Sequence, residues 1–476
     1  MLAPARKVLT PLIIACALFM ENLDSSIIAT ALPTIANSLH TDPLRLNLAI
    51  TSYMFSLAVF IPLSGWTADR LGARTVFRAA IVVFTLGSIS CGLSTSLLSL
   101  VLSRILQGLG GAMMVPVGRL VLLRTIAKKD LVNAMAWVTA PALIGPVLGP
   151  PLGGLIVTYM SWRWIFFVNI PIGIVGLVLA TLYIENVRGR SREKLDKFGF
   201  VLMGLTMAGL VFGFETIGRK LLPWPAVIGL MIGGCLCFGL YLWHVRRIPH
   251  PIVDFSVLKY PTYRASITGG SLFRISIGAL PFLLPLMLQY GFGMTPLASG
   301  TLTFASAAGA MAMKMTATRI IRRFGFRPIL IGGALINVVF LMGCSLFVPG
   351  MPRYVIFFIL LTGGFFRSLQ FTALNSIAYA EIPDQLMSRA NTFYNMIQQL
   401  TLSLGVACGA LLLNLTLSWH GESTLHADDF WPAYIGIGVM SLFSALSFLQ
   451  LSPEAGQEMS GHKINLVETA PDKPIH

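Results

Sequence analysis

Two acidic residues stand three positions apart in an apolar stretch near the N-terminus. Glu21 and Asp24 lie within residues 10–35, a stretch long enough to cross a bilayer as a helix. A carboxylate inside a membrane is costly unless it is paired or takes up a proton, so such residues commonly mark proton sites. Residues three apart share a helix face, and two acids this close suit a site that must load and unload protons. The pair therefore predicts a proton-coupling site. The alternative is a permanently ionised, structural Asp24 paired with an arginine.

Basic residues also interrupt apolar stretches further along the chain. An arginine keeps its proton in proteins, so its role there is electrostatic. Arg104 is expected to face Asp24 and to favour the ionised acid, with a fixed tether between helices as the alternative. The other intramembrane bases predict a net positive cavity, which favours carboxylate-bearing or otherwise anionic cargo over lipophilic cations. The alternative is that some of them are paired or reach the membrane surface. These residues are Arg119, Arg274, Lys314 and Arg367, and Asn395 and Gln398 add polar lining or hydrogen bonds between helices.

Residues 145–154 read GPVLGPPLGG within another apolar stretch. Glycines spaced four apart let two helix backbones approach closely, and prolines remove backbone donors and bend a helix. The run therefore predicts a kinked membrane helix with a smooth packing face, which suits a hinge or gate and is equally compatible with simple close packing. The residues concerned are Gly145, Pro146, Gly149, Pro150, Gly153 and Gly154.

The whole chain has the composition of a membrane protein. It has 476 residues, a mean hydropathy of +0.78 and only 11% charged residues, whereas a soluble protein has about 25%. We predict an all-α polytopic membrane protein with fourteen transmembrane helices. The expected spans are residues 10–35, 47–67, 75–95, 98–123, 133–160, 162–184, 198–218, 224–245, 264–290, 296–318, 328–348, 353–380, 389–419 and 430–451.

The net charge of +15 reports orientation and not nucleic-acid binding. Most Lys and Arg residues lie at the two termini and in every second loop, for example Arg70, Arg74, Arg124 and Lys128. Cytoplasmic loops carry this excess of basic residues, so the bias predicts that both termini are cytoplasmic. An even number of spans agrees with it. Glu21 and Asp24 interrupt the first apolar stretch, and this stretch has no convincing cleavage site. We therefore expect an uncleaved helix rather than a signal peptide.

The chain contains a weak internal repeat. DRLGAR at residues 69–74 joins the second and third spans, and RRFGFR at 322–327 joins the tenth and eleventh. Aligning Gly72 on Gly325 superimposes two six-helix units, with spans seven and eight as an inserted hairpin. We therefore expect a six-helix bundle at 1–184, a linker and hairpin at 185–250, a second bundle at 251–451 and a disordered cytoplasmic tail at 452–476. Two repeats facing a midplane cavity are typical of alternating-access transporters.

These residues carry a family resemblance. Residues 65–74, 102–112 and 145–154 resemble motifs A, B and C of the major facilitator superfamily. Residues 23–33 and 162–173 resemble the fourteen-helix drug:proton antiporters of the EmrB/QacA type. Within that branch, residues 110–120 and 274–282 are similar to MdtD-type exporters. The motifs run through essentially the whole membrane region in the family's order.

The resemblance implies a major facilitator fold and roles for two motifs. Asp69, Arg70, Gly72 and Arg74 would form a conformational latch, and residues 145–154 would form the antiporter gate that gives the direction of export. The second copy of the latch motif has Arg322 where an acid would stand, so it cannot make the same interactions.

The resemblance also implies a function. We expect a proton-driven exporter of drugs or metabolites in a bacterial cytoplasmic (inner) membrane, with cargo such as organic acids, iron chelates or siderophores. Its partners would be this small molecule, protons and lipid; it would work as a monomer without a cofactor or metal, and it is not expected to be an enzyme. Two alternatives stay open: a proton-coupled importer of organic acids or sugars, and a transport-inactive receptor or scaffold.

Overall fold

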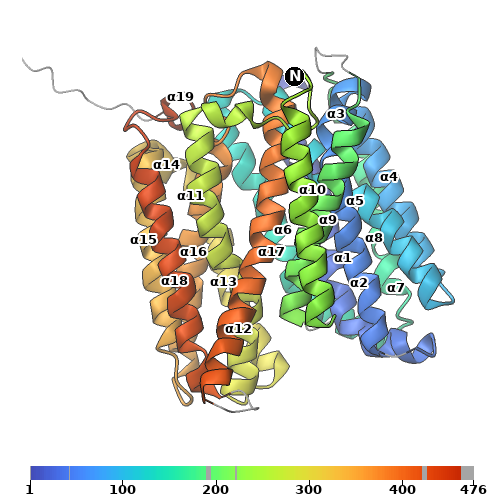
Figure 1. Ribbon diagram of the computed structural model, residues 1–476, viewed down its shortest axis with the longest axis vertical. Coiled ribbons are helices and arrows are strands. Elements are labelled where there is room, and N and C mark those ends of the chain that lie inside the picture. The colour runs from blue at the N-terminus through green and yellow to red at the C-terminus, as the bar shows by residue number, and fades with distance from the viewer. Residues whose placement is uncertain (1, 42, 189–193, 220–221, 421–425, 462–476) are drawn as a thin grey trace, which may run out of the picture.

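The computed structural model describes residues 2–41, 43–188, 194–219, 222–420 and 426–461, and these residues form helices and no strands (Figure 1). The first half of the chain forms a group of helices that we call the N-terminal bundle. Its members are α1 (Leu2–Ser38), α2 (Pro43–Phe60), α3 (Leu63–Leu71), α4 (Ala73–Gly92), α5 (Leu97–Thr125), α6 (Lys128–Tyr159), α7 (Trp164–Phe167) and α8 (Asn169–Tyr183).

The second half forms a corresponding C-terminal bundle. Its helices are α11 (Pro261–Gly278), α12 (Leu280–Leu286), α13 (Pro296–Lys314), α14 (Ala317–Phe324), α15 (Phe326–Ser345), α16 (Arg353–Ile377), α17 (Met387–His420) and α18 (Trp431–Leu449). Between the bundles lies a hairpin of α9 (Lys197–Arg219) and α10 (Trp224–Val245). The shorter elements are η1 (Phe255–Lys259), η2 (Met287–Gly291), η3 (Asp384–Leu386), η4 (Ala427–Asp429) and α19 (Gln457–Ser460).

Each predicted span coincides with one or more helices. Over the described residues, 11 helices are long and apolar enough to cross a membrane, or 12 when α2 and α3 count as one span bent by 59°. The bend lies at Pro62, immediately before α3. The sequence predicts one continuous span over residues 47–67 instead. The predicted spans 133–160 and 296–318 fall on α6 and α13, which are helical but are not among these candidates.

The internal repeat is visible in the backbone. α4 and α15 are both 20 residues long, and each begins directly after the glycine on which the two halves align. Gly72 has φ 93° and Gly325 has φ 75°, a region that side chains rarely adopt. The same sharp turn between a short helix and a long one is therefore built twice. The packing repeats as well, because α4 lies on α5 as α15 lies on α16, and α1 on α6 as α11 on α17.

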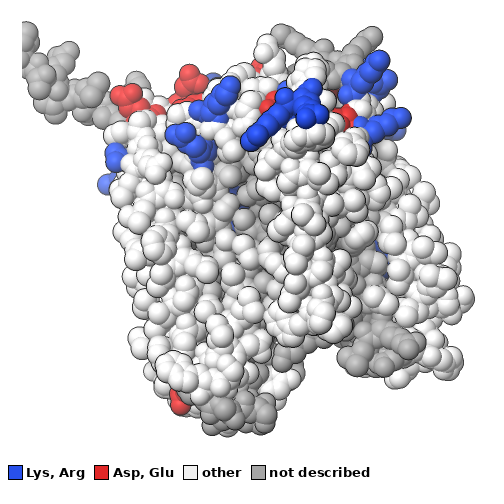
Figure 2. Space-filling model, in the orientation of Figure 1, with Lys and Arg blue, Asp and Glu red and all other residues white. Residues whose placement is uncertain are grey.

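Large apolar side chains on the outside of the helices are exposed, as expected where a helix faces lipid. On α10, for example, Leu236, Leu240 and Trp243 are each more than half exposed. Charged side chains instead gather on the visible face at one end of the molecule, which carries the turn from α3 to α4 (Figure 2). We call the end that contains residues 69–74 the basic end.

The two bundles meet at the basic end and diverge toward the opposite end (Figure 1). At the basic end α3 packs against α17, and α6 packs against α14 and α16. The α3–α17 contact is very close: a Cβ on Gly65 would lie 2.4 Å from Thr392 Oγ1 and 2.8 Å from Ser388 Oγ. The inserted hairpin joins this seam, because α9 packs on both α2 and α17.

The expected disordered tail differs from the structure over its first residues. The chain folds back after Leu451, and Met459 of α19 is 2% exposed. α19 packs against α6 and α14. Lys128 at the start of α6 donates to the Ala380 carbonyl oxygen at 3.0 Å and lies 3.4 Å from Glu458. The remainder of the expected tail, residues 462–476, lies outside the described residues.

Candidate functional site

Asp24 of α1 lies in a network of hydrogen bonds inside the N-terminal bundle. Its Oδ2 accepts from Arg104 Nη1 at 2.6 Å, and its Oδ1 accepts from Gln107 Nε2 at 2.8 Å and Asn169 Nδ2 at 2.9 Å. The Asp24 and Arg104 side chains are each 1% exposed. Three donors from α5 and α8 thus converge on the two carboxylate oxygens, one of them a charged guanidinium.

Arg104 makes more than this ion pair. Its Nη1 also donates to Gln107 Oε1 at 2.6 Å, and its Nε donates to the Ala49 carbonyl oxygen at 3.1 Å. The guanidinium lies 4.3 Å from the ring centroid of Tyr53. The expected pairing of Arg104 with Asp24 is therefore present, and it joins α1, α2 and α5 in one cluster.

Glu21 lies one turn before Asp24 and is bound quite differently. Its Oε2 is buried and, apart from an interaction with the Tyr53 side chain, has no hydrogen-bond partner among the described residues. Glu21 interacts electrostatically with Asp24 and Tyr53, and no cation lies in a salt bridge with it in the described part of the chain. The two neighbouring acids thus have unlike surroundings: one is held as a paired carboxylate, and the other is not.

A second cluster lies where the bundles meet and centres on Tyr394 of α17. Arg119 of α5 lies 5.4 Å from the Tyr394 ring centroid, and Arg274 of α11 lies 4.7 Å from it. Arg274 donates to the Tyr394 hydroxyl, which in turn donates to Asn375 Oδ1 at 2.8 Å. Arg119 donates to Gln398 Oε1 at 3.3 and 3.4 Å. One guanidinium from each bundle therefore approaches the same aromatic ring.

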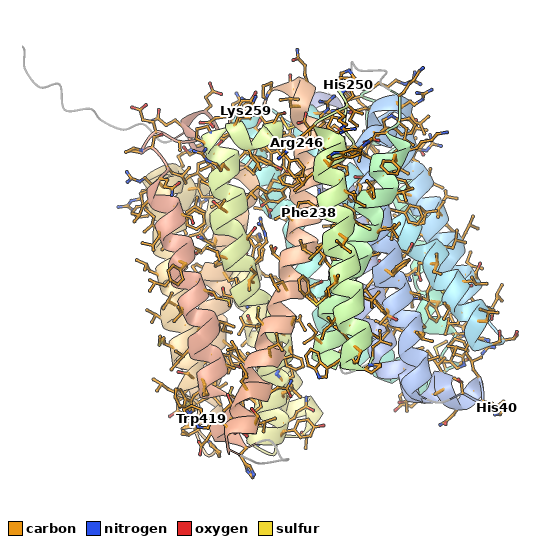
Figure 3. All side chains as sticks on the ribbon, in the orientation of Figure 1. His40, Phe238, Arg246, His250, Lys259 and Trp419 are labelled. Carbon is orange, nitrogen blue, oxygen red and sulfur yellow. The ribbon has the colours of Figure 1, made fainter. Side chains whose placement is uncertain are left out.

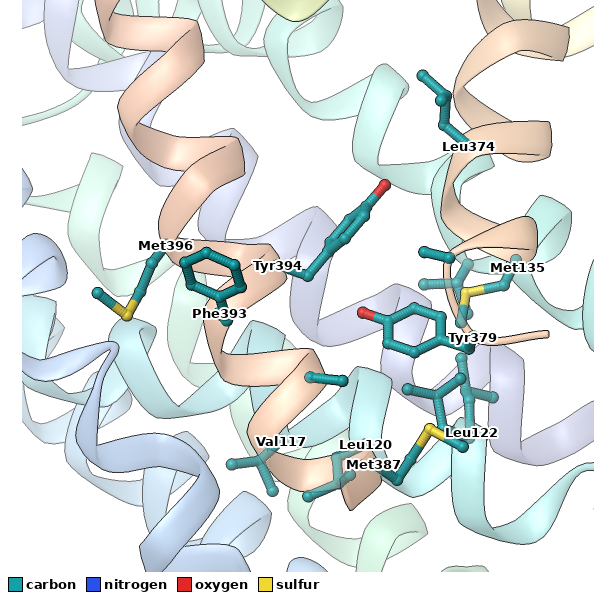
Figure 4. Packing of buried hydrophobic residues seen from close by; sticks show 14 of the residues in the cluster. Val117, Leu120, Leu122, Met135, Leu374, Tyr379, Met387, Phe393, Tyr394 and Met396 are labelled. Atoms are coloured by element: carbon teal, nitrogen blue, oxygen red, sulfur yellow. The ribbon is translucent and has the colours of Figure 1, made fainter. Parts of the chain in front are cut away.

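Apolar and aromatic side chains surround this cluster. Tyr379 and Tyr394 lie with ring centroids 5.6 Å apart, and Val117 and Leu120 of α5 lie near Met387 of α17 (Figure 4). Arg274 is completely buried, and its Nε and Nη1 have no hydrogen-bond partner in the described residues. Neither Arg119 nor Arg274 forms an ion pair within that set. An unpaired buried cation is costly, so the cluster is suited to receive an anion.

The other expected cavity residues are placed separately. Lys314 of α13 donates to Thr372 Oγ1 at 2.8 Å, and Arg367 of α16 donates to Ser306 Oγ at 2.5 Å. Both cations thus link α13 to α16. Asn395 Nδ2 donates to the Asn391 carbonyl oxygen at 2.6 Å.

The expected latch residues lie at the basic end. Asp69 forms a salt bridge with Arg124 at the end of α5. Arg70 lies over the Trp66 ring at 5.4 Å, and Arg74 Nη1 donates to the Ile184 carbonyl oxygen at 3.4 Å. These contacts tie α3 to α5 and α4 to the end of α8 within one bundle, while Gly65 of the same motif makes the close approach to α17.

The segments on either side of the hairpin line a crevice at the same end. Arg389 of α17 donates to Asp254 Oδ2 at 2.8 Å. Burial raises the pKa of Asp254, but hydrogen bonds from Ser256 and Arg389 outweigh it and hold that pKa below its usual range. Figure 3 places Arg246, His250 and Lys259 at this end, and His40 and Trp419 at the opposite one. The crevice is lined by Gly65, Trp66, Asp69, Ser388, Arg389, Thr392 and residues 194–196 and 250–252.

The glycine-rich run of α6 contacts its own bundle. A Cβ on Gly145 would lie 2.8 Å from the Leu23 backbone nitrogen, and one on Gly149 would lie 1.9 Å from Ser26 Oγ. Ser26 Oγ also donates to the Gly145 carbonyl oxygen at 3.1 Å. These glycines therefore allow α6 to pack tightly on α1, whereas a Cβ on Gly154 would meet nothing within 4 Å. Gly153 is buried, and the side chains of Pro146 and Pro150 lie outside the described residues.

The sequence profile of the Major Facilitator Superfamily matches residues 14–401 and, in a second alignment, residues 266–463. The chain belongs to this superfamily. Major facilitator proteins are transporters rather than enzymes, and they use ion gradients without a cofactor. Within the described residues, no group of three or more His, Cys, Asp and Glu side chains could hold a metal ion.

Bacterial relatives match almost the full length of this major facilitator protein. A Salmonella paratyphi A protein named "Putative multidrug resistance protein MdtD" is 37% identical over 458 residues, which covers 94% of this chain and 95% of the relative. The protein of that name from an Enterobacter species is 36% identical over 461 residues, with the same coverage. The crystal structure of the human organic anion transporter MFSD10 matches with a TM-score of 0.67, covering 93% of this chain and 99% of that one. At 14% identity it shows the shared fold alone.

Several residues of the site were not predicted. Gln107 lies one turn after Arg104 on the same helix, so its spacing could have indicated a shared role. Asn169 and Tyr53 carry no such signal, because a single polar or aromatic residue in a span more often packs between helices. Only the folded bundle brings them to Asp24 and Arg104.

Proposed function

We propose that this protein is a proton-coupled exporter of small anionic molecules. The observation that carries the proposal is the buried Asp24–Arg104 pair with Glu21 beside it, in a chain of a transporter family. Charged groups inside a membrane are expensive, and a static scaffold has no use for them.

Proton coupling is assigned to Asp24, Glu21 and Arg104. Arg104 stays charged and holds Asp24 ionised while the site is empty of protons. Proton arrival from outside weakens the pair, and proton release inside restores it. A buried pair of this kind has two states that differ in charge, which is what a coupled conformational change requires.

Cargo binding is assigned to Arg119 and Arg274 on either side of Tyr394. A carboxylate entering there would meet guanidinium donors that the described residues leave without an acidic partner. Organic acids, iron chelates and siderophores are candidate cargoes. Arg367, Lys314, Asn395 and Gln398 would contribute further positive or polar lining.

The motifs and the arrangement of the bundles support export as the direction of transport. Asp69, Arg70, Gly72 and Arg74 would stabilise the closed basic end, and residues 145–154, packed on α1, would transmit movement to the acid pair. The relatives' name refers to multidrug resistance, which export would explain. If the basic end is cytoplasmic, as the positive-inside rule predicts, the present conformation is open to the outside.

We also propose that the chain crosses a bacterial inner membrane fourteen times with both termini in the cytoplasm, as a monomer. Residues 1–184 and 251–451 would be the rocking bundles, and 185–250 the linker and hairpin.

A thermal-shift screen of purified protein against organic acids, iron chelates, siderophores and cationic dyes would identify a ligand. That compound is then offered to everted vesicles, with and without an imposed proton gradient. We expect accumulation only with the gradient, and its loss in Asp24→Asn. Asp428→Asn, which alters an exposed acid, is the matched control and should transport normally.

Other results would redirect the proposal. Gradient-driven loss of the compound from preloaded everted vesicles would indicate an importer. A ligand-binding protein with no transport in either direction would be a receptor or scaffold. Stronger binding of cationic dyes than of carboxylates would refute the assignment of anionic cargo.

A further inference from the structure

Tyr53 of α2 contacts Arg104 and interacts with both acids of the N-terminal bundle. Its ring lies against the Arg104 guanidinium at 4.3 Å, and the side chain is 2% exposed. Its buried hydroxyl interacts with Glu21, and neither this hydroxyl nor Glu21 Oε2 has another hydrogen-bond partner among the described residues. We propose that Tyr53 is a positioning residue that links Glu21 to the Asp24–Arg104 pair, so that proton binding at Glu21 alters that pair. This inference rests on the proposed proton coupling.

The sequence makes specific room for this tyrosine. A Cβ on Gly108 would lie 2.7 Å from the Tyr53 carbonyl oxygen, and one on Gly111 would lie 2.9 Å from the Tyr53 hydroxyl. Both glycines belong to the helix that carries Arg104, and together they let α5 approach α2. Ser56 Oγ fixes the same crossing by donating to the Ile105 carbonyl oxygen at 2.8 Å. The glycines next to the arginine therefore determine where the tyrosine ring can lie.

A tyrosine side chain can interact with a carboxyl group through its hydroxyl and with a cation through its ring. Its hydroxyl can donate to a carboxylate and can accept from a carboxylic acid, so it serves both protonation states of Glu21. Its ring face attracts the Arg104 guanidinium at the same time. No net proton moves to or from Tyr53: the proton arrives from water at the Glu21 carboxylate, and the hydroxyl reorients.

The other groups around this tyrosine do not replace the link. The ionisable groups that interact electrostatically with Tyr53 are Glu21, Asp24 and Arg104. Cys91 of α4 completes the set, since it interacts with Arg104 and Asp24 and lies 3.6 Å from Gln107 Oε1. Both carboxylate oxygens of Asp24 already accept hydrogen bonds, from three donors in all. Of the two acids near Tyr53, Glu21 is thus the one whose buried oxygen can accept a hydrogen bond from the Tyr53 hydroxyl.

The test measures conformation against pH and needs no cargo. Spin labels are placed at Leu93 and Leu346, exposed residues that follow the equivalent helices α4 and α15. Buried Cys91 and Cys344 are kept, and the other cysteines are replaced by alanine. Distances between the labels in lipid nanodiscs then give the pH at which the two conformations are equally populated.

We expect Tyr53→Phe to move this midpoint by about one pH unit to higher pH, a tenfold change in proton affinity. The reason is that the charged carboxylate loses a donor while the ring against Arg104 is kept. Tyr434→Phe is the matched control, because Tyr434 is also fully buried with an unpartnered hydroxyl but lies in α18. Its midpoint should equal that of the unmodified protein.

Two further results separate this inference from the proposed function. If the unmodified protein shows no pH-dependent change, proton coupling fails and the role of Tyr53 fails with it. If that change is present but Tyr53→Phe leaves the midpoint in place, only the role of Tyr53 is refuted. In a Glu21→Gln background Tyr53→Phe should have no further effect, and a second shift there would assign the tyrosine a purely structural role.

Discussion

Arg274 is a buried charge that the fold does not compensate, so its replacement by methionine should stabilise the protein. Two of its nitrogens, Nε and Nη1, are buried without partners among the described residues. Each such group costs about 1–3 kcal/mol. Methionine has a similar length and keeps the site filled.

The losses on replacement are smaller than this gain. The hydrogen bond from Arg274 to the Tyr394 hydroxyl contributes about 1 kcal/mol, and the contact with its ring about 0.5–2 kcal/mol. The Tyr394 hydroxyl keeps its bond to Asn375 at 2.8 Å and is not left unsatisfied. We therefore expect Arg274→Met to raise the free energy of unfolding by about 1–3 kcal/mol, while anionic cargo no longer binds.

Arg104→Met is the comparison that makes this expectation specific. Arg104 is equally buried, but its removal leaves the Asp24 carboxylate without its cation, which costs about 3–5 kcal/mol. Unfolding of both variants in detergent micelles, followed by tryptophan fluorescence during SDS titration, measures the difference. If Arg274→Met destabilises the protein as much as Arg104→Met does, the view of Arg274 as an uncompensated anion site is refuted.

Three further substitutions or conditions test other parts of the structure. Gly149→Ala should lower the thermal unfolding midpoint strongly, whereas Gly154→Ala in the same helix should leave it unchanged; equal effects would contradict the close packing of α6 on α1. Gly65→Ala should force α3 from α17, so a cysteine placed at Ser388 should react faster with a thiol reagent, and an unchanged rate would contradict the closed basic end. Because the pKa of Asp254 lies below its usual range, its contribution to stability is complete above about pH 4 and is lost as the pH falls through the lowered value. The unfolding midpoint should therefore fall in acid by less in Asp254→Asn than in the unmodified protein.

The positions of the helices could be predicted because hydropathy and helix length are local properties. The repeat was also readable, since Gly72 and Gly325 occupy a backbone conformation that restricts the residue type. The pairing of Arg104 with Asp24 followed from the cost of isolated charges in a membrane. What could not be predicted was which neighbours complete each site, because that depends on how helices far apart in sequence cross.

The glycine-rich run of α6 illustrates this limit. Its composition indicated a smooth face, but not the helix that this face contacts, and Gly145 and Gly149 prove to lie against α1 of the same bundle. Similarly, the sequence becomes polar from Ser452 onward, which predicted a disordered tail. Met459 of that segment is nevertheless buried, because the chain turns back onto α6 and α14. A short apolar anchor in a polar segment is too weak a pattern to distinguish from a solvated tail.

The hairpin makes the two flanks of the bundle interface mechanically unequal. On one flank α9 packs on α2 and α17, and a Cβ on Gly204 of α9 would lie 3.4 Å from Val59. On the other flank α6 packs directly on α13 and α16. Any rotation of one bundle against the other must therefore make α9 slide along α2 or along α17. The resistance to that rotation and the access of lipid would then differ between the two sides of the bundle interface, although the bundles themselves are related by a repeat.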